Sequence, residues 1–150
     1  MRTHRATTGS TALPVDIVEL PEPLFDAAVR LWHDSGLTRP WNDPDEDLRR
    51  AVRSAGSTVL ACVAEGQLLG TAMVGHDGHR AWVYYVAVRQ DQRRRGLGRR
   101  LMSACADWAA GCGVPKVQLM VRTGNEPVLA FYERLGFQTE QVVVLGRRLL

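Results

Sequence analysis

A short run of arginines and glycines, placed between a predicted strand and a predicted helix, limits the folds open to this chain more than any other segment. The run covers residues 93–100 and follows an apolar, β-prone stretch that ends at Val88. From Leu97 to the glycines at 111 and 113, apolar residues recur at helical spacing. Backbone N–H groups at a helix start have no partner within the helix, so a glycine-rich turn there can hold phosphate, and arginines strengthen the binding. The run therefore predicts a site for a polyanion or a phosphorylated cofactor.

Two common phosphate-binding motifs do not match this run. A Walker loop requires a lysine followed by serine or threonine, and the segment has neither residue type. A dinucleotide-binding fingerprint requires a third glycine at the position that Leu101 occupies. The pattern that remains is Arg93-x-x-Gly96-x-Gly98.

Hydrophobic periodicity and turn residues predict one mixed α/β domain over residues 15–150, after a flexible leader at 1–14. The expected order is β-α-α-β-β-β-α-β-α-β, a mostly antiparallel central sheet flanked by helices. The three middle strands form a meander, because short turns at 65–67 and 77–78 separate them. The predicted strands cover residues 15–20, 58–64, 68–74, 81–88, 116–121 and 138–145, with a last short strand at 147–149. The predicted helices cover residues 24–36, 43–55, 97–111 and 125–135.

The composition excludes several classes of protein. Lysine and arginine total 19 against 16 acidic residues, so the net charge of +3 says less than the local cluster of arginines. Cys62, Cys105 and Cys112 are an odd number without CxxC spacing, which argues against a disulfide framework and a zinc site. No stretch approaches the roughly 18 apolar residues of a membrane span, and the N-terminus has no signal-peptide core. We therefore expect a cytoplasmic protein that needs no metal.

The arginine and glycine run is part of a longer pattern, and a second pattern lies downstream. The first is V-A-V at 86–88 followed by R-x-x-G-x-G at 93–98, and the second is N-E-P-V-L-A-F-Y-E-R-L-G-F at 125–137. In this order, and on matching predicted elements, they resemble the signatures of the GNAT superfamily of N-acetyltransferases. Residues 39–44 and 75–80 resemble its YpeA-like bacterial branch. The resemblance implies a three-layer GNAT fold, acetyl-CoA as cosubstrate, and direct attack by a small-molecule or peptide amine in a ternary complex.

The resemblance also implies roles for individual residues. Tyr132 would lie beside the thioester sulfur as the catalytic proton donor, and Asn125 would hydrogen-bond the pantetheine arm. The backbone of the strand before the turn would pair with that arm, and the turn would hold the pyrophosphate. The implied cofactor residues are Val86, Ala87, Val88, Arg93, Arg94, Arg95, Gly96, Leu97, Gly98, Arg99 and Asn125.

The direction of this strand predicts where the acceptor enters. With the phosphates beyond Val88, a spacing of about 3.3 Å per residue places the thioester beside Tyr84 to Val86. An N–H group of Val86 or Ala87 could stabilise the oxyanion there. The acceptor would approach from the beginning of the strand, near the linker at 39–43 and the hairpin at 76–80. The candidate acceptor residues are Trp41, Asn42, Asp43, His76, His79 and Tyr84.

Several of these residues also have structural explanations. Asp43 precedes a proline and lies three residues before Glu46, which predicts a helix N-cap with a capping glutamate. Trp41 could pack over the core, and His76 and His79 could simply flank a hairpin turn. Tyr132, at helical spacing, could equally be a core residue.

The general base is left open by the sequence. Many members of the superfamily carry a glutamate near Tyr84 or Tyr85, whereas this chain has no carboxylate from Ala81 to Val88. A water chain, His76, His79 or an acceptor with a low amine pKa could replace it.

Two other functions compete with the acetyltransferase hypothesis. The missing glutamate favours an acyl-CoA-binding regulatory module without turnover. The arginine cluster also fits a nucleic-acid-binding domain, whose binding would depend steeply on salt. Acetyl transfer explains both motifs, so we expect neither nucleic acid nor membrane as a partner. The oligomeric state, a homodimer included, is left open.

Overall fold

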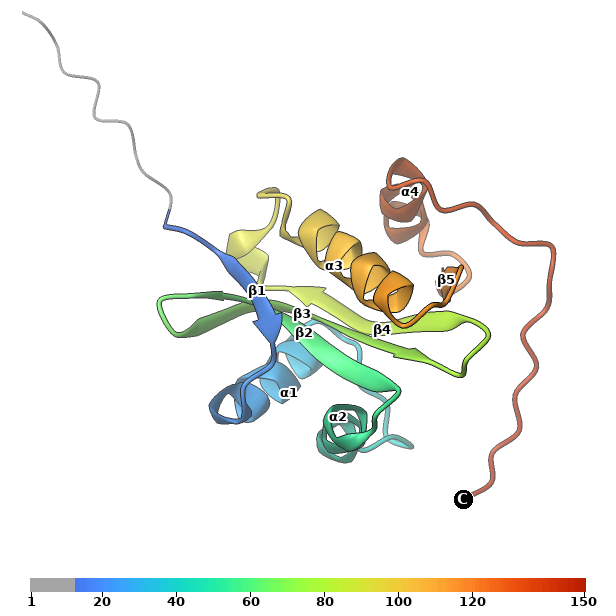
Figure 1. The fold of residues 1–150 in the computed structure, drawn as a ribbon, viewed down its shortest axis with the longest axis horizontal. Coiled ribbons are helices and arrows are strands. Elements are labelled where there is room, and N and C mark those ends of the chain that lie inside the picture. Colours follow the sequence, from blue (N-terminus) through green and yellow to red (C-terminus); the bar gives the residue numbers. More distant parts are fainter. Residues whose placement is uncertain (1–12) are drawn as a thin grey trace, which may run out of the picture. The chain divides into compact units, whose positions relative to one another are not determined.

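The computed structural model describes residues 13–150. The expected leader at 1–14 therefore lies, apart from its last two residues, outside the described part of the chain. The described residues form two compact units that divide after Leu119. Figure 1 shows the helices and strands of both units. Within residues 13–150, none of the helices combines the length and the apolar character that crossing a bilayer requires.

The first unit is built on a five-stranded sheet with the order β1-β2-β3-β4-β5. Neighbouring strands are antiparallel except for the pair β4 and β5, which is parallel. A tight turn joins β2 to β3, and its Glu65 and Gly66 both have positive φ, as such hairpin turns require. The meander predicted for the three middle strands is therefore confirmed. The strands are β1 (Asp16–Glu19), β2 (Ser57–Ala64), β3 (Gln67–His76), β4 (Ala81–Val88) and β5 (Val117–Leu119).

Helices cover both faces of this sheet. Helices α1 (Phe25–Asp34) and α2 (Pro44–Arg53) lie on one face, and α3 (Leu97–Gly111) lies on the other (Figure 1). Short 3-10 turns, η1 (Glu22–Leu24) and η2 (Gln90–Gln92), precede α1 and α3. The mixed α/β class expected from the sequence is confirmed.

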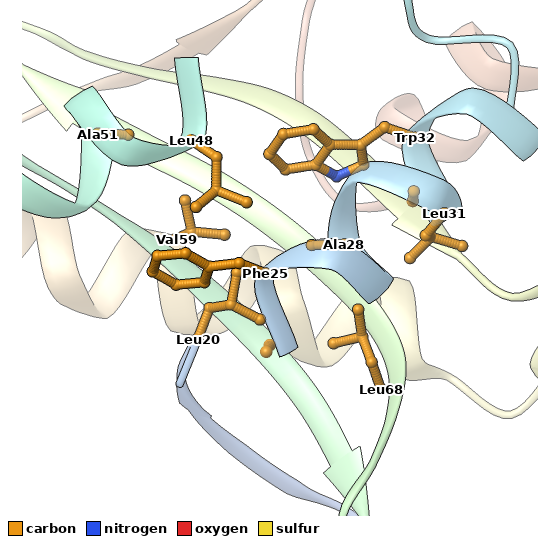
Figure 2. Packing of buried hydrophobic residues seen from close by; sticks show 11 residues of the cluster. Leu20, Phe25, Ala28, Leu31, Trp32, Leu48, Ala51, Val59 and Leu68 are labelled. Atoms are coloured by element: carbon orange, nitrogen blue, oxygen red, sulfur yellow. The ribbon is translucent and has the colours of Figure 1, made fainter. Parts of the chain in front are cut away.

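The main core lies between the sheet and the pair α1 and α2. Figure 2 shows Leu48 of α2 directed at Val59 of the sheet, with the Trp32 ring of α1 extending toward Leu48 and Leu31 of α1 on the side of Leu68. Trp32 and Leu48 are completely buried. Burying large apolar side chains is the main favourable term in folding, so these residues fix both helices on the sheet.

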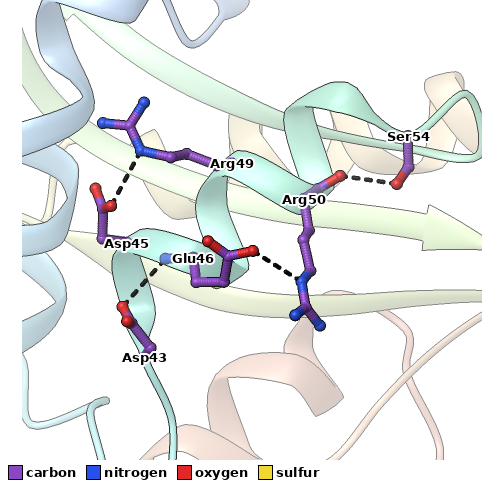
Figure 3. Close-up of polar contacts among 6 residues, drawn as sticks. All are labelled: Asp43, Asp45, Glu46, Arg49, Arg50 and Ser54. Atoms are coloured by element: carbon purple, nitrogen blue, oxygen red, sulfur yellow. Dashed lines mark hydrogen bonds and ion pairs between the residues drawn. The ribbon is translucent and has the colours of Figure 1, made fainter.

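Helix α2 begins with the cap that the sequence predicts. The Asp43 carboxylate accepts a hydrogen bond from the Glu46 N–H at 3.1 Å (Figure 3). Two ion pairs one turn apart, Arg49 with Asp45 and Arg50 with Glu46, follow along the exposed side. This cap satisfies a backbone donor at the helix start with the chain's own carboxylate.

The second unit contains α4 (Glu126–Arg134). The helix ends before Gly136, whose φ of +93° suits the position after a helix. The strands predicted at 138–145 and 147–149 are wrong, because the described part of the chain has no strand after Leu119. Residues 142–145 favour strands by composition, but a strand also needs a hydrogen-bonded neighbour. Their side chains are instead 61–91% exposed.

Candidate functional site

The second half of β4 has an edge that β5 does not cover. The pairing of β4 with β5 ends at Val83 and Leu119. On the other side, the Arg89 N–H donates to the Leu69 carbonyl of the neighbouring strand β3. Because hydrogen-bonding direction alternates along a strand, Ala87 also faces β3, whereas Val88 turns its N–H and C=O toward the uncovered edge. An extended, amide-containing ligand could pair with this edge.

A β-bulge interrupts β4 just before this edge. Tyr84 pairs with Met73 and Ala87 pairs with Thr71, so β4 has one residue more than β3 between these pairs. The extra residue is accommodated at Tyr85, whose φ is +50°. The sequence reasoning missed this bulge, since a tyrosine at positive φ has no signal in the pattern of apolar residues.

Helix α3 begins directly after this strand and lacks a side-chain cap. Its N-cap residue is Gly96, with a φ of +74°, and no side chain bonds to the first N–H groups. Nothing lies within 4 Å of the position that a Cβ atom would take at Gly96. The first turn of α3 has no acidic residue, whereas the first turn of α2 does have acidic residues. The N–H groups of the first turn, from Leu97 to Arg99, are therefore open to an external anion.

The arginines around this turn divide into two groups. Arg89 forms an ion pair with Asp91 at 2.7 Å, and Arg100 donates to the Val15 carbonyl at 2.7 Å, so both side chains already have partners within the protein. Arg95 hydrogen-bonds to Gln92. Among the described arginines of this turn, Arg93, Arg94 and Arg99 are exposed and form neither an ion pair nor a side-chain hydrogen bond. These three predicted cofactor residues are available to bind phosphate oxygens.

A cavity of about 240 Å³ lies near the beginning of β4, where the acceptor is predicted to enter. Two of the predicted acceptor residues, Tyr84 and His76, line it together with Ala51 of α2. Burial raises the pKa of Tyr84, so its phenol is neutral at physiological pH. The other lining residues are Ser57, Met73, Gly75, Asp77 and Trp82.

The remaining predicted acceptor residues do not line this cavity. Asn42 and His79 are exposed, and Trp41 is 57% exposed. Asp43 is occupied as the cap of α2. His76, which does line the cavity, also has a structural role: it accepts a hydrogen bond from the Gly78 N–H at 3.1 Å, and this contact helps to form the β3–β4 hairpin.

Asn125 and Tyr132 belong to the second unit, at the start and in the last turn of α4. The exposed side chain of Asn125 does not cap the helix, although Asn125 is the N-cap residue. Tyr132 is 8% exposed, and its ring packs edge-on against Phe131 and Phe137 at centroid distances of 5.0 and 5.7 Å. This packing fixes the ring of Tyr132 within its own unit.

The two buried cysteines are not prepared to act as nucleophiles. Burial raises the pKa of Cys62 to about 11 and that of Cys105 to about 12, so both thiols stay protonated at neutral pH. Within residues 13–150, no group of three or more His, Cys, Asp or Glu side chains is arranged to hold a metal ion. The uncovered edge of β4 and the open N–H groups of α3 can position and polarise bound reactants.

Comparisons with known proteins match most of the chain. The model of the acetyltransferase (GNAT) family matches residues 25–137. Over 126 residues, 84% of this chain and 89% of the relative, the sequence is 38% identical to an acetyltransferase of Pectobacterium atrosepticum. An uncharacterised N-acetyltransferase of Yersinia pestis is 36% identical over the same shares of both chains. The solved structure of the aminoglycoside N-acetyltransferase AAC(6')-Iy in complex with CoA gives a TM-score of 0.80 at 16% identity, covering 93% of this chain and 98% of that one.

Proposed function

Because the chain belongs to the acetyltransferase (GNAT) family, we propose that it transfers the acetyl group of acetyl-CoA directly to a small-molecule amine. The resemblance stated from the two sequence motifs is thereby confirmed. The proposal rests on two features that follow one another directly along the chain. The uncovered edge of β4 runs within a few residues into the uncapped start of α3.

Each part of acetyl-CoA has a matching feature in this arrangement. The pyrophosphate accepts hydrogen bonds from the first N–H groups of α3, and the exposed arginines Arg93, Arg94 and Arg99 neutralise its charge. The pantetheine amides pair with the β4 edge at Val88 and at the Val86 carbonyl as an added strand would, which leaves the Val86 N–H for the thioester. The thioester then lies near the bulge, beside Tyr84 to Val86.

The transfer step is a direct attack on this thioester. The neutral amine nitrogen of the acceptor attacks the carbonyl carbon, a C–N bond forms, and negative charge develops on the oxygen. A backbone N–H of the bulge stabilises that charge. The C–S bond then breaks, the nitrogen loses a proton, and the CoA thiolate gains one. The motif at 125–137 assigns the donated proton to the Tyr132 hydroxyl by its resemblance to the superfamily.

The acceptor is proposed to be a small molecule that enters through the cavity near the start of β4. Tyr84 lines this cavity and also lies where the strand geometry places the thioester. At about 240 Å³ the cavity is smaller than most ligand sites, so it suits one amine-bearing part of an acceptor. Solved structures with the same fold include an aminoglycoside acetyltransferase bound to sisomicin, which supports this class of acceptor.

Titration calorimetry tests the cofactor half of this proposal. We expect binding of both acetyl-CoA and CoA, with a phosphate contribution that weakens as salt is raised. Absence of binding to either molecule would show that the β4 edge and the α3 start are not a CoA site.

A further inference from the structure

We propose that Thr71 is a positioning residue for acetyl transfer, because its hydroxyl holds the Tyr85–Val86 peptide in the orientation that presents the Val86 N–H to the thioester. Thr71 lies on β3, is not itself part of either sequence motif, and is completely buried. Its hydroxyl donates to the Tyr85 carbonyl at 3.0 Å. The inference rests on the proposed function, since it assigns a task within that reaction.

The direction of the hydrogen bonds around Thr71 is fixed. The Trp32 indole N–H lies 2.8 Å from the Thr71 hydroxyl oxygen, and an indole nitrogen can only donate. Thr71 therefore accepts from Trp32 and has one proton to give, which goes to the Tyr85 carbonyl. Because hydrogen bonds in such a chain polarise one another, the Tyr85–Val86 peptide becomes a stronger donor at its N–H.

The geometry of the peptide bond determines where that N–H points. In a planar trans peptide the C=O and N–H groups point in opposite directions. The Tyr85 carbonyl points to Thr71, so the Val86 N–H points away from Thr71. Val86 lies after Val83, the residue at which the pairing of β4 with β5 ends. Ala87, the other candidate oxyanion donor from the sequence, instead pairs with Thr71 of β3.

Further contacts keep the bulge in this conformation. The Tyr85 ring stacks on the Trp32 ring with centroids 4.0 Å apart. The Tyr85 phenol donates to the Asp47 carboxylate of α2 at 2.8 Å. Both burial and this carboxylate raise the pKa of Tyr85, so the phenol remains a donor. A residue at positive φ is costly without such support, and the support comes from the ring, the phenol and the carbonyl together.

The proposal is tested by NMR of bound acetyl-CoA that carries a carbon-13 label at its thioester carbonyl carbon. The method needs no acceptor. In the wild-type protein a hydrogen bond from Val86 should move the bound resonance downfield of free acetyl-CoA. Thr71→Ser keeps the hydroxyl and should keep this shift. Thr71→Val removes the hydroxyl and should return the resonance toward its free position, while CoA affinity stays the same.

Two further variants separate positioning from stability. Thr71→Val leaves the buried Trp32 N–H without its acceptor, so this protein is expected to melt earlier. The double variant Trp32→Phe with Thr71→Val removes both polar partners, keeps an aromatic ring against Tyr85, and should lose the shift while remaining folded. Thr58→Val removes a hydroxyl from another buried threonine and should leave the shift unchanged.

Each possible result either supports or overturns the role proposed for Thr71. The proposal is overturned if acetyl-CoA bound to the Thr71→Val protein or the double variant keeps the wild-type resonance. It is also overturned if the wild-type protein binds acetyl-CoA without any downfield shift. A wild-type protein that does not bind acetyl-CoA would instead show that the proposed function is wrong. Once an acceptor is known, kcat of the Thr71→Val protein should fall by nearly the roughly 10²–10³-fold that removal of an oxyanion donor typically costs. The KM for acetyl-CoA should not change.

Discussion

Among single residues, Gly96 has two separable tasks, one in folding and one in binding. Its φ of +74° starts α3, and the space beside it is open. Gly96→Asp places a carboxylate where α2 has its own capping Asp43. The new carboxylate would accept hydrogen bonds from the N–H groups of α3 and repel the pyrophosphate. We therefore expect acetyl-CoA binding, measured by calorimetry, to be lost or severely weakened.

The control for this change is at the other end of the same helix. Gly113 follows α3, has a φ of +79°, and also has open space beside it. Alanine at either glycine should cost about 1–2 kcal/mol of folding free energy, because a Cβ disfavours this conformation. Gly113→Asp should nevertheless bind acetyl-CoA like the wild-type protein. Equal loss of binding in the Gly96 and Gly113 variants would contradict an anion site at the start of α3.

Tyr132 is the second residue whose task can be isolated. Tyr132→Phe removes the hydroxyl and retains the ring that packs between Phe131 and Phe137. If the hydroxyl protonates the departing thiolate, turnover with an established acceptor should fall by about 10²–10⁴-fold. Affinity for acetyl-CoA, measured by calorimetry, should stay close to that of the wild-type protein. Unchanged turnover with the chemical step limiting would make Tyr132 a structural residue.

The sequence predicts local residue roles far better than long-range ones. The cap formed by Asp43 could be predicted because all its parts lie within four residues of sequence. The contact of Thr71 with Trp32 joins residues 39 positions apart, and its contact with Tyr85 spans 14. Such pairs depend on the register of the sheet and the placement of a helix on it. Nothing in the pattern around Thr71 distinguishes it from any other threonine in a strand.

At the scale of secondary-structure elements, the spacing between β3 and β4 depends on Gly70. A Cβ atom at this position would lie 2.9 Å from the Ala87 carbonyl oxygen and 3.3 Å from the Val88 side chain. Gly70→Ala must therefore push β4 away from β3. We expect a loss of roughly 1–3 kcal/mol in stability, measured by denaturant unfolding, together with weaker acetyl-CoA binding.

A matched change elsewhere on β3 separates these two effects. At Gly75 a Cβ atom would meet the Ser57 side chain of β2 at 3.2 Å. Gly75→Ala should lower stability without weakening acetyl-CoA binding, because β2 is remote from the β4 edge. The proposed binding edge would be in doubt if Gly70→Ala bound acetyl-CoA as tightly as the wild-type protein.

The elements themselves divide into those fixed locally and those fixed by a neighbour. The boundaries of β2, β3 and β4 could be predicted because turn residues separate apolar runs that pair with one another. The apolar run at 142–145 has the same strand-forming composition, yet its backbone forms no strand. The bulge at Tyr85 is equally invisible in the sequence, since it arises from a mismatch between two paired strands. Composition indicates which segments can form strands, and pairing decides which do.

At the scale of the whole molecule, binding of acetyl-CoA should stabilise the folded state. A ligand present at about 100 times its dissociation constant contributes about 2.7 kcal/mol. For a chain of this size, that corresponds to a rise of roughly 5–10 °C in Tm. Thermal unfolding with and without acetyl-CoA measures this shift. Gly96→Asp should show little or no shift, and an equal shift in both proteins would place the cofactor elsewhere.

Acetyl transfer itself is tested by measuring CoA release from acetyl-CoA while amines are supplied one at a time, with the acetylated product identified by mass spectrometry. Aminoglycosides, polyamines and amino acids form the first panel, because each offers a primary amine on a small molecule. We expect at least one amine to raise CoA release above its acceptor-free rate and to yield an N-acetylated product in equal amount. A protein that binds acetyl-CoA yet releases no CoA with any amine of a wide panel would contradict the proposed function and favour an acyl-CoA-binding regulatory module.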